Sequence, residues 1–177
     1  MEAAAQRDGS GECGMSADPQ AVHPLIRPLN WGDLDRIMEI ELAAYPFPWT
    51  RGIFSDCIRV GYDCWGLQLG SRLIGYCIQT DAAGEAHLLN LCIEPGWQRR
   101  GFGRMLLETA LRIARSHGCS SMYLEVRPSN PAGIALYKSR GFVVIGTRPS
   151  YYSAGEATER DAGDREDALV MRLELQD

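Results

Sequence analysis

The sequence contains no run of 18 or more apolar residues, and therefore lacks the length of apolar chain that a helix needs to cross a bilayer. Its first 24 residues also lack the charged start and the apolar stretch of a secretory signal. We therefore expect a cytoplasmic protein with no membrane association.

Histidine is scarce, and the three that occur (His23, His87 and His117) are far apart and show no spacing typical of metal ligands. None of the six cysteines belongs to a C-x-x-C pair, and most have apolar neighbours. This pattern is typical of buried, reduced thiols rather than of a disulfide or zinc framework. We expect no metal site.

A stripe of basic and aromatic residues, typical of nucleic-acid-binding proteins, is also missing. The net charge is −5, but most of the excess acid lies in two segments, residues 1–22 and 154–167. The remainder is slightly basic, which suits an anionic ligand such as a coenzyme, whereas the acidic segments suit a basic partner. We expect no direct contact with nucleic acid.

The length of 177 residues fits one domain, and the content of 45% apolar and 23% charged residues allows a sizeable core. Residues 1–23 are rich in alanine, glycine, serine and acids without an apolar period, so they are predicted to form a disordered extension. The folded domain is predicted to cover residues 24–177.

Apolar periodicity and capping residues predict an α/β chain of the α+β kind. Helices are expected at 30–45, 50–61, 101–117 and 131–139, and strands at 25–29, 64–69, 73–80, 87–93, 122–126, 142–147 and 168–175. In the first helix, capped by Asn30, we expect one apolar face made of Leu34, Ile37, Met38, Leu42 and Tyr45. The three strands between 64 and 93 are expected to form an antiparallel meander.

The strongest chemical signal is the segment Gln98-Arg99-Arg100-Gly101-Phe102-Gly103, which stands between a strand and the longest helix. Glycines allow a tight turn that directs several amide donors to one point, where the helix dipole also favours negative charge. Together with Arg104, this turn suits a pyrophosphate. The alternative is a helix start whose arginines only aid solubility. The dinucleotide-binding fingerprint fits poorly, because the third glycine is missing and the preceding strand belongs to a meander.

A second group follows about 30 residues later: Leu124-Glu125-Val126, Asn130-Pro131, Ala135-Leu136-Tyr137 and Gly141-Phe142. The two motifs together resemble the GNAT acetyltransferase superfamily, with its coenzyme-binding signature Q/R-x-x-G-x-G/A. Within it the chain is most similar to the RimI-type protein N-terminal alanine acetyltransferases. Further residues that carry this similarity are Tyr45 to Thr50, Asn90-Leu91, Tyr151-Tyr152 and Glu166 to Ala168. It covers about residues 25–175; the N-terminal extension and a longer loop after Tyr152 depart from it.

The resemblance implies a mixed, mostly antiparallel central sheet with a splayed strand pair and helices on both faces. It also implies acetyl-CoA as the donor. The residues it assigns to the coenzyme are Leu91, Cys92, Ile93, Arg99, Arg100, Gly101, Phe102, Gly103, Arg104, Asn130 and Tyr137. The first three would offer backbone groups to the pantetheine arm, which behaves like an extra strand, the next six would hold the pyrophosphate, and the last two would lie near the thioester.

The resemblance further implies that Glu125 is the general base. An acceptor amine is protonated near neutral pH and must lose a proton before it attacks, and a carboxylate can take that proton. Tyr137 would then protonate the departing thiolate, and an amide near Cys92 or Ile93 would meet the oxyanion. Each role has an alternative. Glu125 could instead face solvent or pair with Arg127, Tyr137 could only pack in the core, and Cys92 is expected to be a buried structural thiol.

The leading functional hypothesis is acetylation of a protein α-amine, most specifically the N-terminal alanine of small-subunit ribosomal protein eighteen. The loop from Pro46 to Trp49 is expected to form a wall of the acceptor site, or else a hydrophobic clamp between two helices. Glu41, Glu166 and Asp167 are candidates for attracting a basic peptide. The alternatives are a lysine side chain or small amine as acceptor, and a module that binds acetyl-CoA without turnover.

Overall fold

Seven strands form one mixed sheet in the order β1-β2-β3-β4-β5-β7-β6. The structure, a computed structural model, describes residues 23–152 and 166–175. The predicted disordered extension (apart from His23) and most of the acidic segment 154–167 lie outside the described residues. No helix in the described residues is long and apolar enough to cross a membrane.

Every predicted helix and strand is present. The strands are β1 (Pro24–Pro28), β2 (Asp63–Leu69), β3 (Arg72–Ala82), β4 (Glu85–Ile93), β5 (Ser121–Val126), β6 (Val143–Tyr152) and β7 (Glu166–Glu174). The helices are α1 (Leu34–Ala44), α2 (Arg51–Val60), α3 (Phe102–Ser116) and α4 (Pro131–Lys138), with short 3₁₀ turns η1 (Trp31–Asp33) and η2 (Pro95–Trp97).

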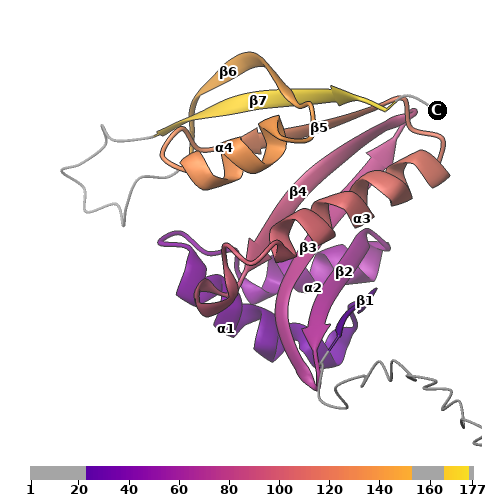
Figure 1. Cartoon of the computed structure of the whole chain (residues 1–177), viewed down its shortest axis with the longest axis vertical. Coiled ribbons are helices and arrows are strands. Elements are labelled where there is room, and N and C mark those ends of the chain that lie inside the picture. The colour runs from indigo at the N-terminus through magenta and orange to yellow at the C-terminus, as the bar shows by residue number, and fades with distance from the viewer. Residues whose placement is uncertain (1–22, 153–165, 176–177) are drawn as a thin grey trace, which may run out of the picture.

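The sheet is mostly antiparallel, and its one parallel pair is β4 with β5, joined by α3. This pairing stops at Leu88 and Leu124, although β4 continues to Ile93. Just beyond that point β4 contains one extra residue, Leu89, relative to β3. Such a bulge bends the strand. The two strands therefore diverge (Figure 1), and the predicted splayed pair is confirmed.

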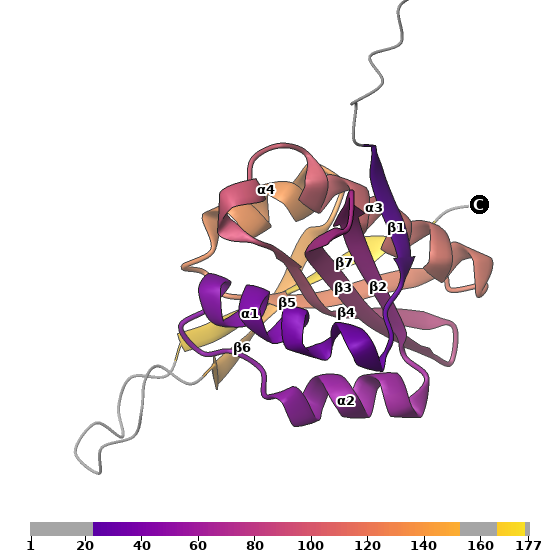
Figure 2. The same cartoon turned by 90° about the horizontal axis from the view of Figure 1, so that it is seen from below.

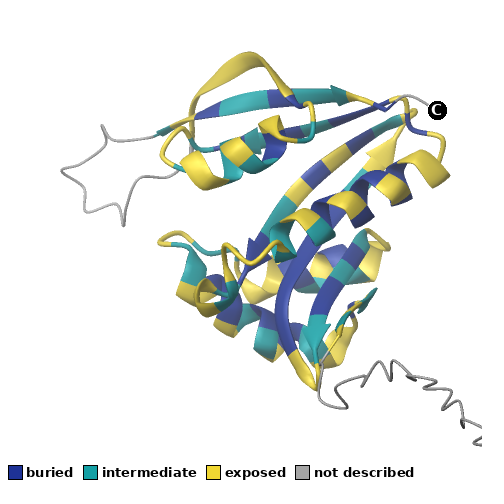
Figure 3. Cartoon of the chain, viewed as in Figure 1, coloured by how far each residue is buried: buried dark blue, intermediate teal, exposed yellow. Residues whose placement is uncertain are grey.

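Helices α1 and α2 cover one face of the sheet, and α3 and α4 cover the other (Figure 2). Each face has its own apolar cluster, and β3, between them, is buried along most of its length, whereas the edge strand β6 is exposed (Figure 3). After the bulge, Leu91 and Ile93 pack with the α3 cluster and Cys92 with the α1 cluster. The side chains at the end of β4 therefore contribute to both apolar clusters.

Local signals account for most helix ends. The side chain of Thr50 accepts a hydrogen bond from the Ile53 amide at the start of α2, and Gly61 ends that helix with a φ of 83°. The expected apolar face of α1 is wrong at Leu42, which is 63% exposed. Instead Ile40 is buried in the apolar cluster, and Glu41 is buried because its carboxylate has hydrogen-bond donors inside the protein.

Strands β3 and β4 approach each other so closely at Gly75 that a side chain does not fit there. A Cβ atom there would lie 2.7 Å from the carbonyl oxygen of Cys92 and would also collide with Ile93. Backbone cannot yield as a side chain can, so we expect Gly75→Ala to lower the free energy of unfolding by about 1–3 kcal/mol in urea denaturation. Gly146→Ala, in the same sheet but with nothing within 4 Å, should stay within about 0.5 kcal/mol of the wild type. Equal effects of the two changes would contradict this.

Candidate active site

The part of β4 that lies beyond its pairing with β5 contains Leu91, Cys92 and Ile93. Side chains already engage two of its carbonyls: the Tyr45 hydroxyl donates to that of Leu91 at 3.0 Å, and the Gln98 amide donates to that of Ile93 at 2.9 Å. In the described residues no strand occupies the β5 side of this segment. An extended ligand can add there as a strand does.

The turn before α3 is shaped to present amide groups. Arg99 has a φ of 62° and Gly101 one of 87°, and left-handed residues of this kind turn successive N–H groups into a concave anion site. Gly101 is also the N-cap of α3, and no side chain caps that helix start. The first amides of α3 and the positive end of its dipole therefore suit a phosphate group.

The arginines of this turn are exposed. The guanidinium of Arg100 lies 5.0 Å from the centre of the Trp97 ring, which in turn packs against Phe102 at 6.2 Å. This stacking could not be predicted from the sequence, since Trp97 belongs to no recognised motif. Arg99 and Arg104 add two further cations to the same turn.

Gly103, on the first turn of α3, faces α4. A Cβ atom at this position would lie 3.4 Å from the Leu136 side chain of α4 and 3.9 Å from Leu91 and Ile93 of β4. The small residue therefore lets the start of α3 lie close to both elements. A larger side chain would narrow the space between the amide turn and the diverging strands.

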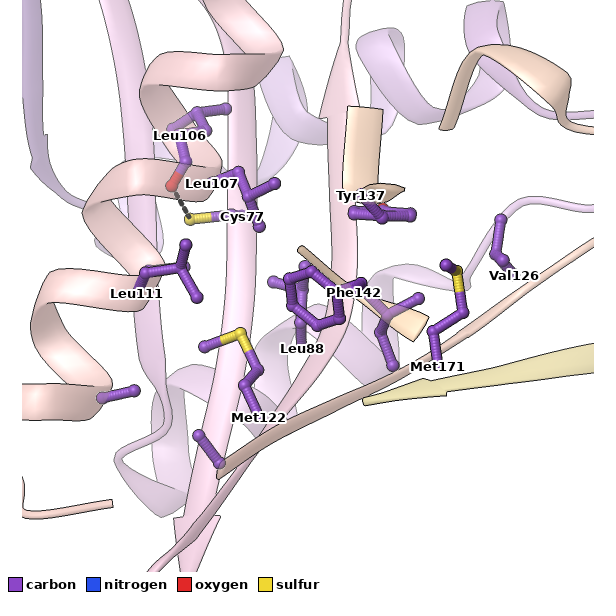
Figure 4. Close-up of a cluster of buried hydrophobic side chains, with 14 of the residues drawn as sticks. Cys77, Leu88, Leu106, Leu107, Leu111, Met122, Val126, Tyr137, Phe142 and Met171 are labelled. Carbon is purple, nitrogen blue, oxygen red and sulfur yellow. Dashed lines mark hydrogen bonds between the residues drawn. The ribbon is translucent and has the colours of Figure 1, made fainter. Parts of the chain in front are cut away.

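Helix α4 contributes Tyr137 and Asn130. Tyr137 is only 9% exposed, packs edge-on against Phe142 at 5.8 Å and lies in the core on the α3 side of the sheet (Figure 4). The Asn130 Oδ1 atom accepts the Gly133 amide at 2.9 Å and caps α4, and its side-chain nitrogen can still donate to a coenzyme. Both predicted coenzyme contacts remain predictions.

Glu125 lies on the opposite face. Along β5 the side chains of Met122, Leu124 and Val126 are buried in the α3 cluster, and Glu125, between the last two, points the other way. Its Oε1 atom lies 2.6 Å from Arg148 of β6. Arg127, the other cation expected near Glu125, pairs with Glu166 at 3.1 Å.

Strand β6 is bent where it meets Glu125. The register shifts between Arg148 and Tyr152, and Ser150 there has a φ of 52°, with its amide bonded to the Asp167 carboxylate at 2.9 Å. The bend lets the Tyr151 ring lie 4.4 Å from the Arg148 guanidinium. The pKa of Tyr151 is raised, mainly by a hydrogen bond to Glu125 and to a lesser extent by burial. Arg148 and Tyr151 thus share one carboxylate, a contact that the sequence analysis missed.

The loop between α1 and α2, residues 45–50, is rich in aromatic side chains and is called the aromatic loop below. It reaches the same face as Glu125. The Phe47 ring lies 5.2 Å from the guanidinium of Arg127, which pairs at 3.1 Å with Glu166. Glu166 also accepts two hydrogen bonds from Ser129. This position supports an acceptor wall for the loop, while Trp49, 5.4 Å from Phe54, also clamps α2.

Of the acids expected to attract a basic peptide, Glu41 is buried, with 1% of its surface exposed. That part of the prediction is wrong, because a buried carboxylate that is hydrogen-bonded internally is shielded from a partner in solution. Glu166 lies beside the loop, against Arg127, and Asp167 follows it in β7, but both carboxylates already accept hydrogen bonds.

Comparison with known proteins places this arrangement in a family. Residues 34–142 match the acetyltransferase (GNAT) family. The [ribosomal protein bS18]-alanine N-acetyltransferase of Salmonella typhimurium is 35% identical over 147 residues, which are 83% of this chain and 95% of that protein. The Escherichia coli K12 protein with the same name is 34% identical over 150 residues, 85% of this chain and 97% of that one.

Solved structures agree. The crystal structure of the Escherichia coli ribosomal-protein-S18-alanine N-acetyltransferase superposes with a TM-score of 0.77 at 34% identity, covering 88% of this chain and 96% of that one. Naa20 of Chaetomium thermophilum, in complex with a bisubstrate analogue, shares the fold with a TM-score of 0.72 at 22% identity, covering 85% and 86% of the two chains. The chain belongs to the GNAT acetyltransferase family.

At the other end of β3, folding gathers three distant side chains. His117 Nδ1 lies 3.0 Å from Asp81 and 3.6 Å from Asp63, and among the described residues these three form the one group that could hold a metal ion. The spacing of these residues along the chain did not predict this group, because folding brings them together from three separate segments. A protonated His117 joins both carboxylates without an ion. The hydrogen bond to Asp81 is the main cause of the raised pKa of His117.

The raised pKa of His117 predicts a pH-dependent contribution to stability. A histidine whose pKa is higher in the folded than in the unfolded protein stabilises fully below the unfolded value, about 6.5, and loses this effect as the pH rises through the folded value. Because His117 is 41% exposed, the contribution should be under about 1 kcal/mol. We expect His117→Gln to lower the urea midpoint at pH 5.5 but not at pH 8.5, and Asp81→Asn to do the same. A loss independent of pH would contradict the pairing.

Proposed function

We propose that this protein transfers the acetyl group of acetyl-CoA to the α-amine of a protein, with the N-terminal alanine of ribosomal protein bS18 as the acceptor. The names of the relatives at 34–35% identity support the reaction and the acceptor. A structure of a more distant member of the fold was solved with acetyl-CoA. A cytoplasmic reaction suits such an acceptor.

One observation carries the proposal: β4 and β5 separate beyond Leu88 and Leu124, with an uncapped helix start on one face and Glu125 on the other. In this arrangement the diphosphate binds at the turn before α3, and the pantetheine arm lies along the open side of β4. The thioester then reaches the opening from the α3 face, while the acceptor amine comes from the α1 face.

The chemistry follows from these positions. Glu125 accepts a proton from the acceptor ammonium, directly or through water, and the free amine attacks the thioester carbon. A backbone amide near Cys92 or Ile93 donates to the oxyanion. The carbon–sulfur bond breaks, and Tyr137 gives its phenolic proton to the coenzyme thiolate. The attacking nitrogen loses its second proton as the amide forms, and this proton restores the tyrosine through solvent. The amine displaces the thiolate directly, so no covalent enzyme intermediate forms.

The acceptor is tested with synthetic peptides. A peptide that begins with alanine and is rich in arginine should release coenzyme A thiol and gain one acetyl group by mass spectrometry, whereas its N-terminally blocked copy should not. Equal rates for a blocked peptide that contains an internal lysine would favour the side-chain acceptor instead. Tight binding of acetyl-CoA without release, whatever the acceptor, would favour a binding module.

The proton-transfer roles are tested by substitution. We expect Glu125→Gln to lower kcat by roughly 10² to 10⁴ at neutral pH, with the affinity for acetyl-CoA nearly unchanged in calorimetry. Glu174→Gln is the matched control, because Glu174 is also a strand glutamate paired with an arginine, Arg172 at 2.9 Å. Tyr137→Phe should likewise reduce kcat more than binding. A variant of Glu125 with normal turnover would remove it from this role.

A further inference from the structure

Glu41 is a buried carboxylate that the reaction above does not use. It lies on α1 with 1% of its surface exposed, next to Leu42, which is 63% exposed. Its Oε1 atom accepts the backbone amide of Trp49 at 2.8 Å, and its Oε2 atom accepts the hydroxyl of Tyr76. The Asn90 side chain gives a further hydrogen bond. Because an ionised carboxyl only accepts, three donors suit it.

This placement is costly. Burial raises the pKa of Glu41, and the hydrogen bonds from Tyr76, Trp49 and Asn90 oppose that rise. An apolar residue of similar size would pack at the same place without the cost of burying a charge. The carboxylate therefore has a role other than packing. Its three partners come from the loop between α1 and α2, from β3 and from β4, so its hydrogen bonds connect these three segments.

Two of these partners lie at the reacting end of the sheet. Asn90 directly follows the bulge in β4, where the pairing with β5 has ended. Trp49 is the last residue of the aromatic loop before the cap of α2. Glu41 thus fastens the end of this loop to the segment of β4 that would lie beside the thioester.

The rest of the loop strengthens the same connection. At the start of the loop, the Tyr45 hydroxyl donates to the Leu91 carbonyl of β4. The pKa of Tyr45 is raised well above its usual value, first by burial and then by the nearby Cys92 and Tyr137. At the middle of the loop, Phe47 lies against Arg127, just after β5. The loop therefore bridges the two diverging strands on the acceptor face.

We infer that Glu41 is a positioning residue, which holds the loop from Tyr45 to Thr50 against β4 so that the acceptor amine meets the thioester at a fixed distance. The inference rests on the proposed function in taking this loop as the acceptor wall. Glu41 itself does not touch the substrates. Displacements of about 1 Å at a reacting centre can cost as much as 10²-fold in rate, which is the scale of effect at stake.

The test compares Glu41→Leu with Glu41→Gln. Leucine fills the site and avoids a buried charge but accepts no hydrogen bond, so folding is expected to survive, as circular dichroism will check. Glutamine retains an acceptor for the Trp49 amide and can donate to the Tyr76 hydroxyl. Glu39→Ala is the matched control, because Glu39 is on the same helix but is exposed and pairs only with Arg36 in the described residues.

With the alanine peptide as acceptor, we expect Glu41→Leu to lower kcat/KM for the peptide about tenfold or more, while the dissociation constant of acetyl-CoA changes less than about twofold. Glu41→Gln should restore most of the loss, and Glu39→Ala should behave as the wild type. Unchanged peptide kinetics in folded Glu41→Leu would overturn the positioning role.

Hydrogen exchange provides a readout that needs no turnover. Amide exchange in the peptide that contains Trp49 should be faster in Glu41→Leu than in the wild type, Glu41→Gln or Glu39→Ala. Unchanged exchange would overturn the attachment of the loop. Faster exchange in a protein whose wild type turns over no peptide would support the attachment and count against the proposed function, so the two failures are distinguishable.

Discussion

The backbone of β4 keeps β3 as a partner to its end but has β5 only as far as Leu88. Backbone N–H and C=O groups inside a protein need partners, and an opening in the middle of a sheet leaves some of them to be satisfied in another way. Side chains take two of the carbonyls, and an extended ligand suits the rest. The extra residue at Leu89 lies where the pairing ends, and the surrounding site is arranged around this opening.

The two faces of the opening are built by different means. On the α3 face the geometry is local: left-handed residues at Arg99 and Gly101 and an uncapped helix start follow one another in the chain. On the α1 face it is tertiary, because the carboxylate of Glu125 comes from β5 and its cation from β6, and the loop that lies beside them comes from between α1 and α2. Under the proposed function, the local part holds the donor, which is common to many enzymes, and the tertiary part selects the acceptor.

This difference also explains what the sequence could predict. The turn from Gln98 to Gly103, the cap at Thr50 and the antiparallel meander of β2, β3 and β4 follow from neighbouring residues, and all of them are present in the structure. The partner of Glu125 was not predictable, since Arg148 reaches it only through a bend in an edge strand. The apolar face of α1 was wrong at Leu42, because a glutamate with internal donors took a core position that hydrophobic periodicity reserves for apolar residues.

The buried cysteines have a practical consequence. All five described cysteines are buried and free, and burial raises the pKa of Cys64, Cys77 and Cys92 to about 12 and that of Cys57 and Cys119 above the ordinary value. At neutral pH these thiols are therefore protonated, and the thiolate is the form that attacks disulfide reagents. Colour reagents that detect a thiol will consequently report the small, solvated sulfur of a released coenzyme long before they reach these side chains in the folded protein.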